Sequence, residues 1–215
     1  MSLFTRAGSA LFDLLAPLEC AACGQPAAHG YCGDCRRLLV AAPARDLEGV
    51  PVLAAAAYAA PLDAAIHRYK YGSRPDLAGA LAGLLPRAAL AGASGDARTL
   101  FVPVPLHRSR LAERGYDQSA LLASALAARA GRPASARALC RTRPTAQQAR
   151  LDERGRAQNV LGAFSAGGGT ALAQRPVVLV DDVVTTGATA RACVHTLRAA
   201  GARVVAVACV ASTPR

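Results

Sequence analysis

Residues 177–189 of this 215-residue chain read Val-Val-Leu-Val-Asp-Asp-Val-Val-Thr-Thr-Gly-Ala-Thr, and this stretch decides the fold. Its four leading apolar residues, three of them β-branched, predict a buried parallel strand over 177–180. Two carboxylates, Asp181 and Asp182, end that strand, where open α/β sheets hold their ligands. A short Thr/Gly loop follows, and then a helical pattern through Ala199. Because free backbone N–H groups, hydroxyls and the positive end of a helix dipole meet in such a loop, the stretch predicts an anion site, most naturally for phosphate.

The two aspartates restrict what this anion site binds. Carboxylates beside a phosphate repel it unless they do another job, such as binding sugar hydroxyls or a metal-linked group. Ribose 5-phosphate satisfies both halves of the stretch. The alternative is an ordinary strand–turn–helix with Thr186 as the helix N-cap, which accounts for one threonine but for neither aspartate.

The stretch resembles the phosphoribosyl pyrophosphate (PRPP) motif of type I phosphoribosyltransferases. Four further blocks resemble the ComF (competence protein F) family: Tyr69-Lys70-Tyr71-Gly72-x-Arg74-Pro75, Pro103-Val104-Pro105-Leu106-His107-Arg108, Arg114-Gly115-Tyr116-Asp117-Gln118 and Asn159-Val160-x-Gly162-Ala163-Phe164. The resemblance extends from Cys20 to Val210. It implies a zinc ribbon, expected within residues 1–45, joined to a phosphoribosyltransferase-like domain over residues 46–215.

The resemblance also implies roles for the residues of the motif. Asp181 and Asp182 are expected to meet the 2- and 3-hydroxyls of the ribose. Their charge also favours an oxocarbenium-like transition state as pyrophosphate leaves C1, so they are the expected catalytic residues. The 5-phosphate is expected among Thr185, Thr186, Gly187, Ala188 and Thr189. Mg²⁺ is expected to arrive with PRPP.

Basic segments supply the rest of the implied site. His107 and Arg108 lie in the segment that corresponds to a pyrophosphate loop, where a guanidinium can clamp phosphate oxygens in bidentate fashion. Lys70 is expected to add a phosphate contact from the opposite wall. The stretch 141–159 corresponds to a loop that closes over PRPP, and its donors are Arg143, Thr145, Gln147, Gln148, Arg150, Arg154 and Arg156. A solvated surface histidine and a merely solvated loop are the alternatives. Asp117 departs from the family, which often has Asn at this position.

Four cysteines near the N-terminus have the spacing of a metal site. Cys20-x-x-Cys23 and Cys32-x-x-Cys35 can place four thiolates around one tetrahedral Zn²⁺, which is then structural because no coordination position stays open. His29 is a conceivable substitute ligand. A redox dithiol and disulfides are the alternatives, and a reducing compartment disfavours the disulfides. Cys140, Cys193 and Cys209 fall in apolar settings and are expected to pack as small hydrophobic residues.

Composition narrows the class of protein. The net charge of +11 predicts attraction to polyanions or to small ligands crowded with phosphates. Lys70 is the only lysine among 25 basic residues, which favours a role that guanidinium cannot fill, although chance explains it as well. No apolar run reaches the roughly 18 residues needed to cross a bilayer, so no membrane insertion is expected. With no recognisable export signal, a cytoplasmic location is expected.

Strand and helix patterns alternate along the chain. Strands are expected over 52–58, 100–104, 138–140, 177–180 and 204–210, and helices over 63–71, 75–90 and 117–130. This alternation predicts an α/β fold with a mostly parallel sheet flanked by helices.

Two functions from different classes fit these observations. The first is a Mg-assisted phosphoribosyltransferase, a pentosyl glycosyltransferase that uses PRPP. The second is a non-catalytic protein of DNA uptake and transformation that binds single-stranded DNA or proteins of the competence machinery. The scarcity of aromatic residues, with no Trp, weakens direct DNA binding. An ATPase is excluded because no Gly-x-x-x-x-Gly-Lys-Ser/Thr segment occurs.

Overall fold

A four-stranded, all-parallel sheet organises the main part of the chain. The computed structural model describes residues 19–93, 95–143 and 162–213. The sheet order is β1-β6-β5-β2, with strands β1 (Val52–Ala57), β6 (Arg203–Ser212), β5 (Pro176–Val184) and β2 (Leu100–Pro103). A separate antiparallel pair joins β3 (Leu139–Arg141) to β4 (Phe164–Ala166). The expected parallel α/β sheet is therefore confirmed.

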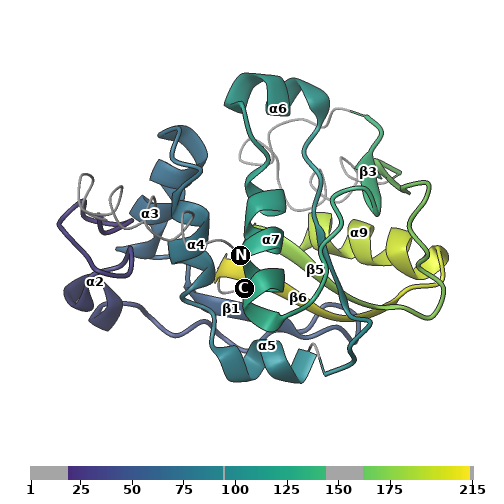
Figure 1. Ribbon diagram of the computed structural model, residues 1–215, viewed down its shortest axis with the longest axis horizontal. Helices are drawn as coiled ribbons and strands as arrows, with labels where there is room; N and C mark the ends of the chain where they lie inside the picture. Colours follow the sequence, from purple (N-terminus) through teal and green to yellow (C-terminus); the bar gives the residue numbers. More distant parts are fainter. Residues whose placement is uncertain (1–18, 94, 144–161, 214–215) are drawn as a thin grey trace, which may run out of the picture.

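Helices cover both faces of this sheet (Figure 1). One face packs against α3 (Leu62–Tyr71), α4 (Leu77–Ala82) and α7 (Gln118–Ala130), and the other packs against α9 (Ala188–Ala199). The alternation of side chains along a strand explains this division, because Val178 and Val180 of β5 belong to the first cluster and Val177 and Leu179 to the second. The remaining helices are α2 (Gly33–Arg37), α5 (Arg87–Ala93) and α6 (Arg108–Arg114).

Strand β5 is longer than the sequence pattern predicts. The aspartates lie inside β5 rather than after it, because the pairing with β6 continues to Val184 and Ser212. Pairing with β2 ends at Val180, where the N–H of Val104 donates to the carbonyl of Val180 at 2.8 Å. The acid pair therefore lies just beyond the end of β2, where that neighbour no longer covers it.

The prediction of a single helix over 75–90 is wrong. Two short helices, α4 and α5, occupy this region, and Pro86 lies between them. Proline lacks the N–H of a helical hydrogen bond and disfavours the helical conformation in the residue before it, so the apolar pattern continues while the helix does not.

The four-cysteine segment packs against the main sheet layer. Its buried residues Cys20, Tyr31 and Cys35 share one hydrophobic cluster with Leu62 and Ile66 of α3. Gly30 approaches α4 so closely that a Cβ at this position would lie 2.6 Å from Cβ of Ala80. No described helix is long and apolar enough to span a membrane.

Candidate functional site

A cavity of about 450 Å³ opens at the carboxyl ends of the parallel strands. Tyr58 follows β1, the segment 104–107 follows β2, and residues 181–185 come from the end of β5. The first turn of α9 and the side chain of Lys70 on α3 complete the wall. This is the edge at which parallel α/β sheets hold ligands.

Most of the site residues predicted from the sequence line this cavity. Lys70, His107, Asp181, Asp182, Thr185, Gly187, Ala188 and Thr189 all contribute to the wall. Thr186, Arg108 and Arg143 are described but are not among the lining residues. The other expected donors of the loop, from Thr145 to Arg156, lie outside the described residues.

Lys70 and Asp182 form an ion pair inside the cavity wall. The distance from Lys70 Nζ to Asp182 Oδ1 is 2.8 Å, and the Asp182 side chain is only 6% exposed. Burial by itself lowers the pKa of Lys70, but the charge and hydrogen bond of Asp182 outweigh burial and raise this pKa above its ordinary value. Asp182 Oδ2 is buried and has no hydrogen-bond partner among the described residues. Asp182 thus carries a buried carboxylate oxygen whose hydrogen-bonding capacity is unsatisfied among the described residues.

Asp181 has a different environment from its neighbour. Its Oδ1 accepts hydrogen bonds from the hydroxyl of Ser119 at 3.1 Å and from the N–H of Asp182 at 2.9 Å. Burial and the charge of Asp182 raise the pKa of Asp181 to about 7, and Lys70 opposes that rise.

The loop after β5 is held in place by arginines. Arg45 donates to the carbonyl oxygens of Thr185 and Val184, and Arg191 Nη2 donates to the carbonyl of Thr186 at 2.8 Å. With these carbonyls occupied, the loop keeps one conformation at the start of α9.

Gly187 is the N-cap of α9 and has φ of +81°. A Cβ at this position would lie 2.7 Å from Leu47 Cδ2, so glycine is required by conformation and by close packing. No side chain caps α9; the hydroxyl of Thr186 accepts only a long hydrogen bond, 3.4 Å, from the N–H of Ala188. Thr186 is therefore not the N-cap of α9, and the alternative in which Thr186 caps this helix is wrong. The N–H groups at the start of α9 have no acceptor within the helix, and residues 187–190 line the cavity, as expected for an anion site.

His107 is the N-cap of α6. Its Nδ1 accepts a hydrogen bond from the N–H of Ser109 at 3.3 Å and lies 2.8 Å from the hydroxyl of the same residue. This use of Nδ1 leaves Nε2 as the nitrogen for a ligand. Arg110 and Arg114, rather than Arg108, bring guanidinium groups from α6 to the cavity wall.

Several residues that line the cavity were not predicted from the sequence. Ser119 and Arg141 line the cavity, and Tyr58 does so at the end of β1. The position of Tyr58 directly after an apolar run was a usable signal, because residues after a parallel strand lie at the ligand edge. Ser119 and Arg45 gave no such signal, since their partners lie 62 and 139 residues away along the chain.

Asp117, the residue that departs from the family pattern, has a structural role. Asp117 is the N-cap of α7, and its Oδ1 accepts from the N–H of Ala120 at 2.9 Å. Its Oδ2 accepts from the N–H of Leu106 at 3.4 Å, which ties the loop after β2 to α7. Asparagine also caps helices, but its amide has one acceptor oxygen, whereas both carboxylate oxygens of Asp117 accept from N–H groups here.

The four cysteines near the N-terminus form one cluster. Their sulfur atoms all lie within 4.8 Å of one another, and Cys23 Sγ and Cys32 Sγ are 3.8 Å apart. A tetrahedral Zn²⁺ with Zn–S bonds of about 2.3 Å separates its sulfurs by about 3.8 Å, whereas a disulfide bond is only about 2 Å long. The N–H of Cys35 also donates to Cys32 Sγ at 3.4 Å. The cluster therefore fits a metal ion such as zinc.

The other cysteines differ in exposure. Cys193 and Cys209 are buried, as expected, and burial raises the pKa of both thiols. Cys140 is exposed, so its expected packing as a small hydrophobic residue is wrong. It lies on the β3–β4 pair, a sheet of two strands within the described part of the chain.

Comparison with known proteins places the chain among bacterial relatives. It is 36% identical over 199 residues to the DNA utilization protein YhgH of Escherichia coli K12, a match that covers 90% of this chain and 84% of that protein. The YhgH protein of Salmonella typhimurium is 35% identical over 204 residues. Competence protein F of Haemophilus influenzae is 36% identical over 107 residues, or 49% of this chain and 47% of that protein.

Two solved structures are similar to part of this chain. One is the allosteric regulatory enzyme of purine biosynthesis, with 28% identity, a TM-score of 0.43, and coverage of 66% of this chain and 29% of that chain. Another is the glutamine PRPP amidotransferase of B. subtilis complexed with ADP and GMP, with 27% identity, a TM-score of 0.42, and coverage of 66% and 30%. The chain thus spans less than a third of either protein.

A scan against protein-family models returned no match. The identity to YhgH nevertheless extends over nine-tenths of the chain. The chain belongs to the ComF (competence protein F) family.

Proposed function

We propose that the cavity binds PRPP and that the protein transfers the phosphoribosyl group to an acceptor. One observation carries the proposal: a single cavity brings together the adjacent acids Asp181 and Asp182 and the uncapped N-terminus of α9. The helix N-terminus supplies N–H donors for a phosphate, and the acids supply acceptors for hydroxyls. A sugar phosphate presents both kinds of group a few ångströms apart.

Each part of the ligand has candidate partners on the cavity wall. The 5-phosphate is assigned to residues 185–189, and the ribose hydroxyls to Asp181 and to the unpartnered Oδ2 of Asp182. The pyrophosphate is assigned to the side that carries His107 and Arg110, with Lys70 on the opposite wall. Arg108 and Arg143 remain candidates for the same anion after movement of their segments.

The same residues suit the departure of pyrophosphate from C1. As the bond from C1 to the pyrophosphate oxygen breaks, positive charge develops on the ribose ring, and two nearby carboxylates favour that charge. His107 Nε2 can donate a proton to the leaving group. Mg²⁺, held by the pyrophosphate oxygens, would neutralise charge on the leaving group.

Binding is testable by calorimetry with PRPP and Mg²⁺. The double variant Asp181→Asn, Asp182→Asn should lose most of the affinity, because amides neither neutralise Lys70 nor accept hydroxyl hydrogen bonds as strongly. Asp96→Asn is a matched control, since Asp96 is paired with Arg98 before the start of β2, at the opposite end of that strand from the cavity. Equal affinity in the double variant and the wild type would refute the site.

Transfer is tested separately from binding. Protein incubated with PRPP, Mg²⁺ and a panel of acceptors should release pyrophosphate faster than the double variant does. Binding without release in any mixture would leave PRPP as a bound ligand and refute the transferase reaction.

We propose zinc as the metal of the four-cysteine cluster, within a ribbon in residues 1–45 that precedes the transferase-like domain over 46–215. The tetrahedral spacing of the sulfurs supports this metal. Thiolate ligands persist where cysteines stay reduced, which supports the cytoplasm as the compartment.

A second candidate function is a part in DNA uptake through binding of single-stranded DNA. The names of the relatives, DNA utilization protein and Competence protein F, and the net charge of +11 favour it. Binding of a labelled oligonucleotide should weaken steeply with salt if phosphate contacts drive it. Absence of binding at low salt would remove this candidate.

A further inference from the structure

Helix α3 lies between the four-cysteine segment and the cavity, and it contacts both. Arg68 and Lys70 are two residues apart on this helix, which corresponds to a rise of about 3 Å along its axis. Arg68 contacts the cysteine segment, and Lys70 contacts Asp182 in the cavity wall. A displacement of α3 therefore moves both contacts together.

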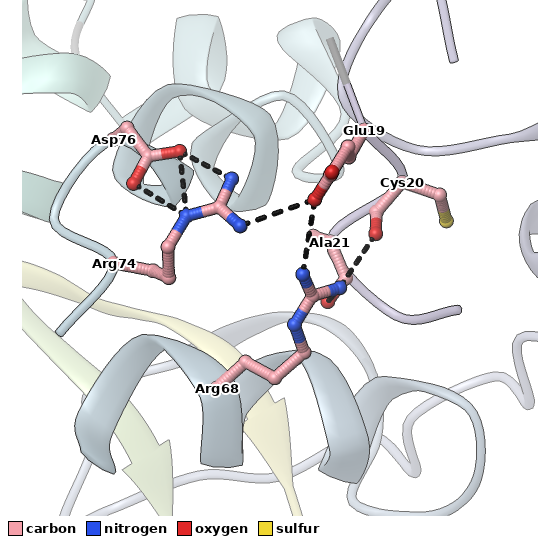
Figure 2. Close-up of polar contacts among 6 residues, drawn as sticks. All are labelled: Glu19, Cys20, Ala21, Arg68, Arg74 and Asp76. Carbon is pink, nitrogen blue, oxygen red and sulfur yellow. Dashed lines mark hydrogen bonds and ion pairs between the residues drawn. The ribbon is translucent and has the colours of Figure 1, made fainter. Parts of the chain in front are cut away.

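The contact on the metal side goes to the backbone between two cysteine ligands. Arg68 Nη1 donates to the carbonyl oxygens of Cys20 at 2.9 Å and of Ala21 at 3.2 Å, and Nη2 lies 3.3 Å from Glu19 Oε2 (Figure 2). These carbonyls belong to the turn from Cys20 to Cys23. Their positions depend on the geometry of the cysteine cluster.

The polar contacts of Glu19 also connect the cysteine segment to the start of α4. Glu19 also accepts from Arg74 Nη1 at 3.2 Å, and Arg74 forms a bidentate pair with Asp76 at the start of α4 (Figure 2). The acid of the cysteine segment is thus shared by arginines from two points of the main layer. Such shared contacts define the orientation of the segment better than an isolated surface pair.

The contact on the cavity side is equally specific. Beside the Lys70–Asp182 pair, the hydroxyl of Tyr69 donates to the carbonyl of Gln118 at 2.7 Å. The hydroxyl of Tyr116 donates to the carbonyl of Tyr69. Tyr69 is fully buried. While the four-cysteine segment packs against α3, the close packing around Tyr69 leaves this helix little freedom to move relative to α7.

The cysteine segment has too little secondary structure to keep its packing against α3 without a metal. Between residues 19 and 45 the described secondary structure is the five-residue helix α2 and an isolated bridge from Glu19 to Pro26. Segments of this size usually need a metal or disulfides to hold one conformation. A bound metal would therefore hold the carbonyls to which Arg68 donates.

We propose that the metal-bound four-cysteine segment positions Lys70 against Asp182 through α3, with Arg68 as the positioning residue. The inference rests on the proposed metal site and adds a role for that metal: it sets the charge arrangement of the cavity without touching any ligand there. It does not require that PRPP is the ligand.

The test uses the fact that Lys70 is the only lysine. Selective labelling with ¹³Cε-lysine gives one side-chain signal, and the rate of acetylation of Lys70 is read from its peptide by mass spectrometry. In Arg68→Ala the signal should shift, and the acetylation rate should rise about fivefold, which corresponds to about 1 kcal/mol of lost ion pairing. Arg98→Ala, the removal of an exposed arginine from a pair near the other end of β2, should leave both readouts unchanged.

Two further measurements keep the test decisive. Arg68→Ala should retain its bound metal, which shows that the effect does not come from metal loss. Wild-type protein stripped by a chelator should reproduce the Arg68→Ala signal, and added Zn²⁺ should restore it, with circular dichroism confirming that both samples are folded.

An unchanged Lys70 signal and acetylation rate in both Arg68→Ala and the metal-free protein would overturn the inference. Since no PRPP is present in these samples, a failure of the proposed PRPP site would leave this result unaffected. Conversely, PRPP binding that survives an unchanged Lys70 signal would support the proposed function while removing the positioning role.

Discussion

Asp181 and Asp182 are adjacent in sequence but have different environments in the cavity. Asp182 is buried and pairs with Lys70 through Oδ1, while its Oδ2 has no hydrogen-bond partner among the described residues. Among the described residues Asp181 forms no ion pair, and burial raises its pKa to about 7. One acid is therefore committed to an ion pair, while the other exchanges its proton near neutral pH.

The raised pKa of Asp181 predicts pH-dependent binding. A ribose hydroxyl donates to the carboxylate, so binding should lower this pKa and release a proton. Affinity should then rise as the pH increases through about 7 and level off above it. Calorimetry in two buffers of different ionisation enthalpy measures the released proton. The phosphates of PRPP also titrate, so Asp181→Asn is the control, and an identical pH profile in that variant would contradict the prediction.

Gly187→Ala should disturb the loop at the start of α9. A left-handed conformation costs a residue with a Cβ about 1–2 kcal/mol, and the added carbon would also press on the buried Leu47. We expect a lower free energy of unfolding, measured with urea, and weaker binding of PRPP. Gly79→Ala is the matched control, because Gly79 lies in α4 with open space around its Cβ position, so this variant should be unchanged or slightly more stable.

Among the elements, the helices that begin at the cavity differ in how they are capped. Side chains cap α6 and α7, whereas α9 begins with Gly187 and leaves N–H groups open. Capped helices hold the loop after β2 in place, and the uncapped helix is the one suited to bind an anion.

The cap of α7 predicts an asymmetry between two substitutions of Asp117. Burial raises the pKa of this carboxyl, and the N–H groups from which it accepts oppose that rise. Asp117→Asn keeps an acceptor for the N–H of Ala120 but loses the acceptor for the N–H of Leu106, so it should cost less stability than Asp117→Ala. Asp117→Ala removes the cap and should cost about 1 kcal/mol. Urea unfolding compares the two, and equal losses would show that the charge matters rather than the cap.

At the scale of the whole molecule, the cysteine segment and the sheet share a core. Cys20 and Cys35 are buried in the same cluster as α3, α4 and α7. Loss of the metal should therefore affect the stability of the main layer as well as the segment.

Metal analysis should return one zinc per chain in protein purified without chelators. Cys35→Ser should lose the metal and lower the melting temperature, because a buried ligand and its packing are both removed. Cys140→Ser is the control, since Cys140 is exposed and outside the cluster, and its zinc content should be unchanged. Zinc-free protein with an unaltered melting temperature would argue against a structural metal.

The sequence by itself determined the features that depend on neighbouring residues. The strand, the acid pair, the Thr/Gly loop and the following helix are contiguous, and the spacing of the four cysteines is local, so their chemistry could be predicted without coordinates. Predictions from contiguous residues failed in two places. The apolar pattern over 75–90 did not reveal the break near Pro86. The strand pattern did not show that pairing with β6 extends β5 through the aspartates.

Only the tertiary structure decided which distant residues serve that motif. Lys70 meets Asp182, Ser119 meets Asp181, and Arg45 holds the loop carbonyls across 139 residues of chain. Such pairings follow from the sheet order and from helix packing, which bring together residues with no shared periodicity. The same reason explains why Arg110 rather than Arg108 lines the cavity, because the turn of α6, and not the sequence of charges, sets the direction of each side chain.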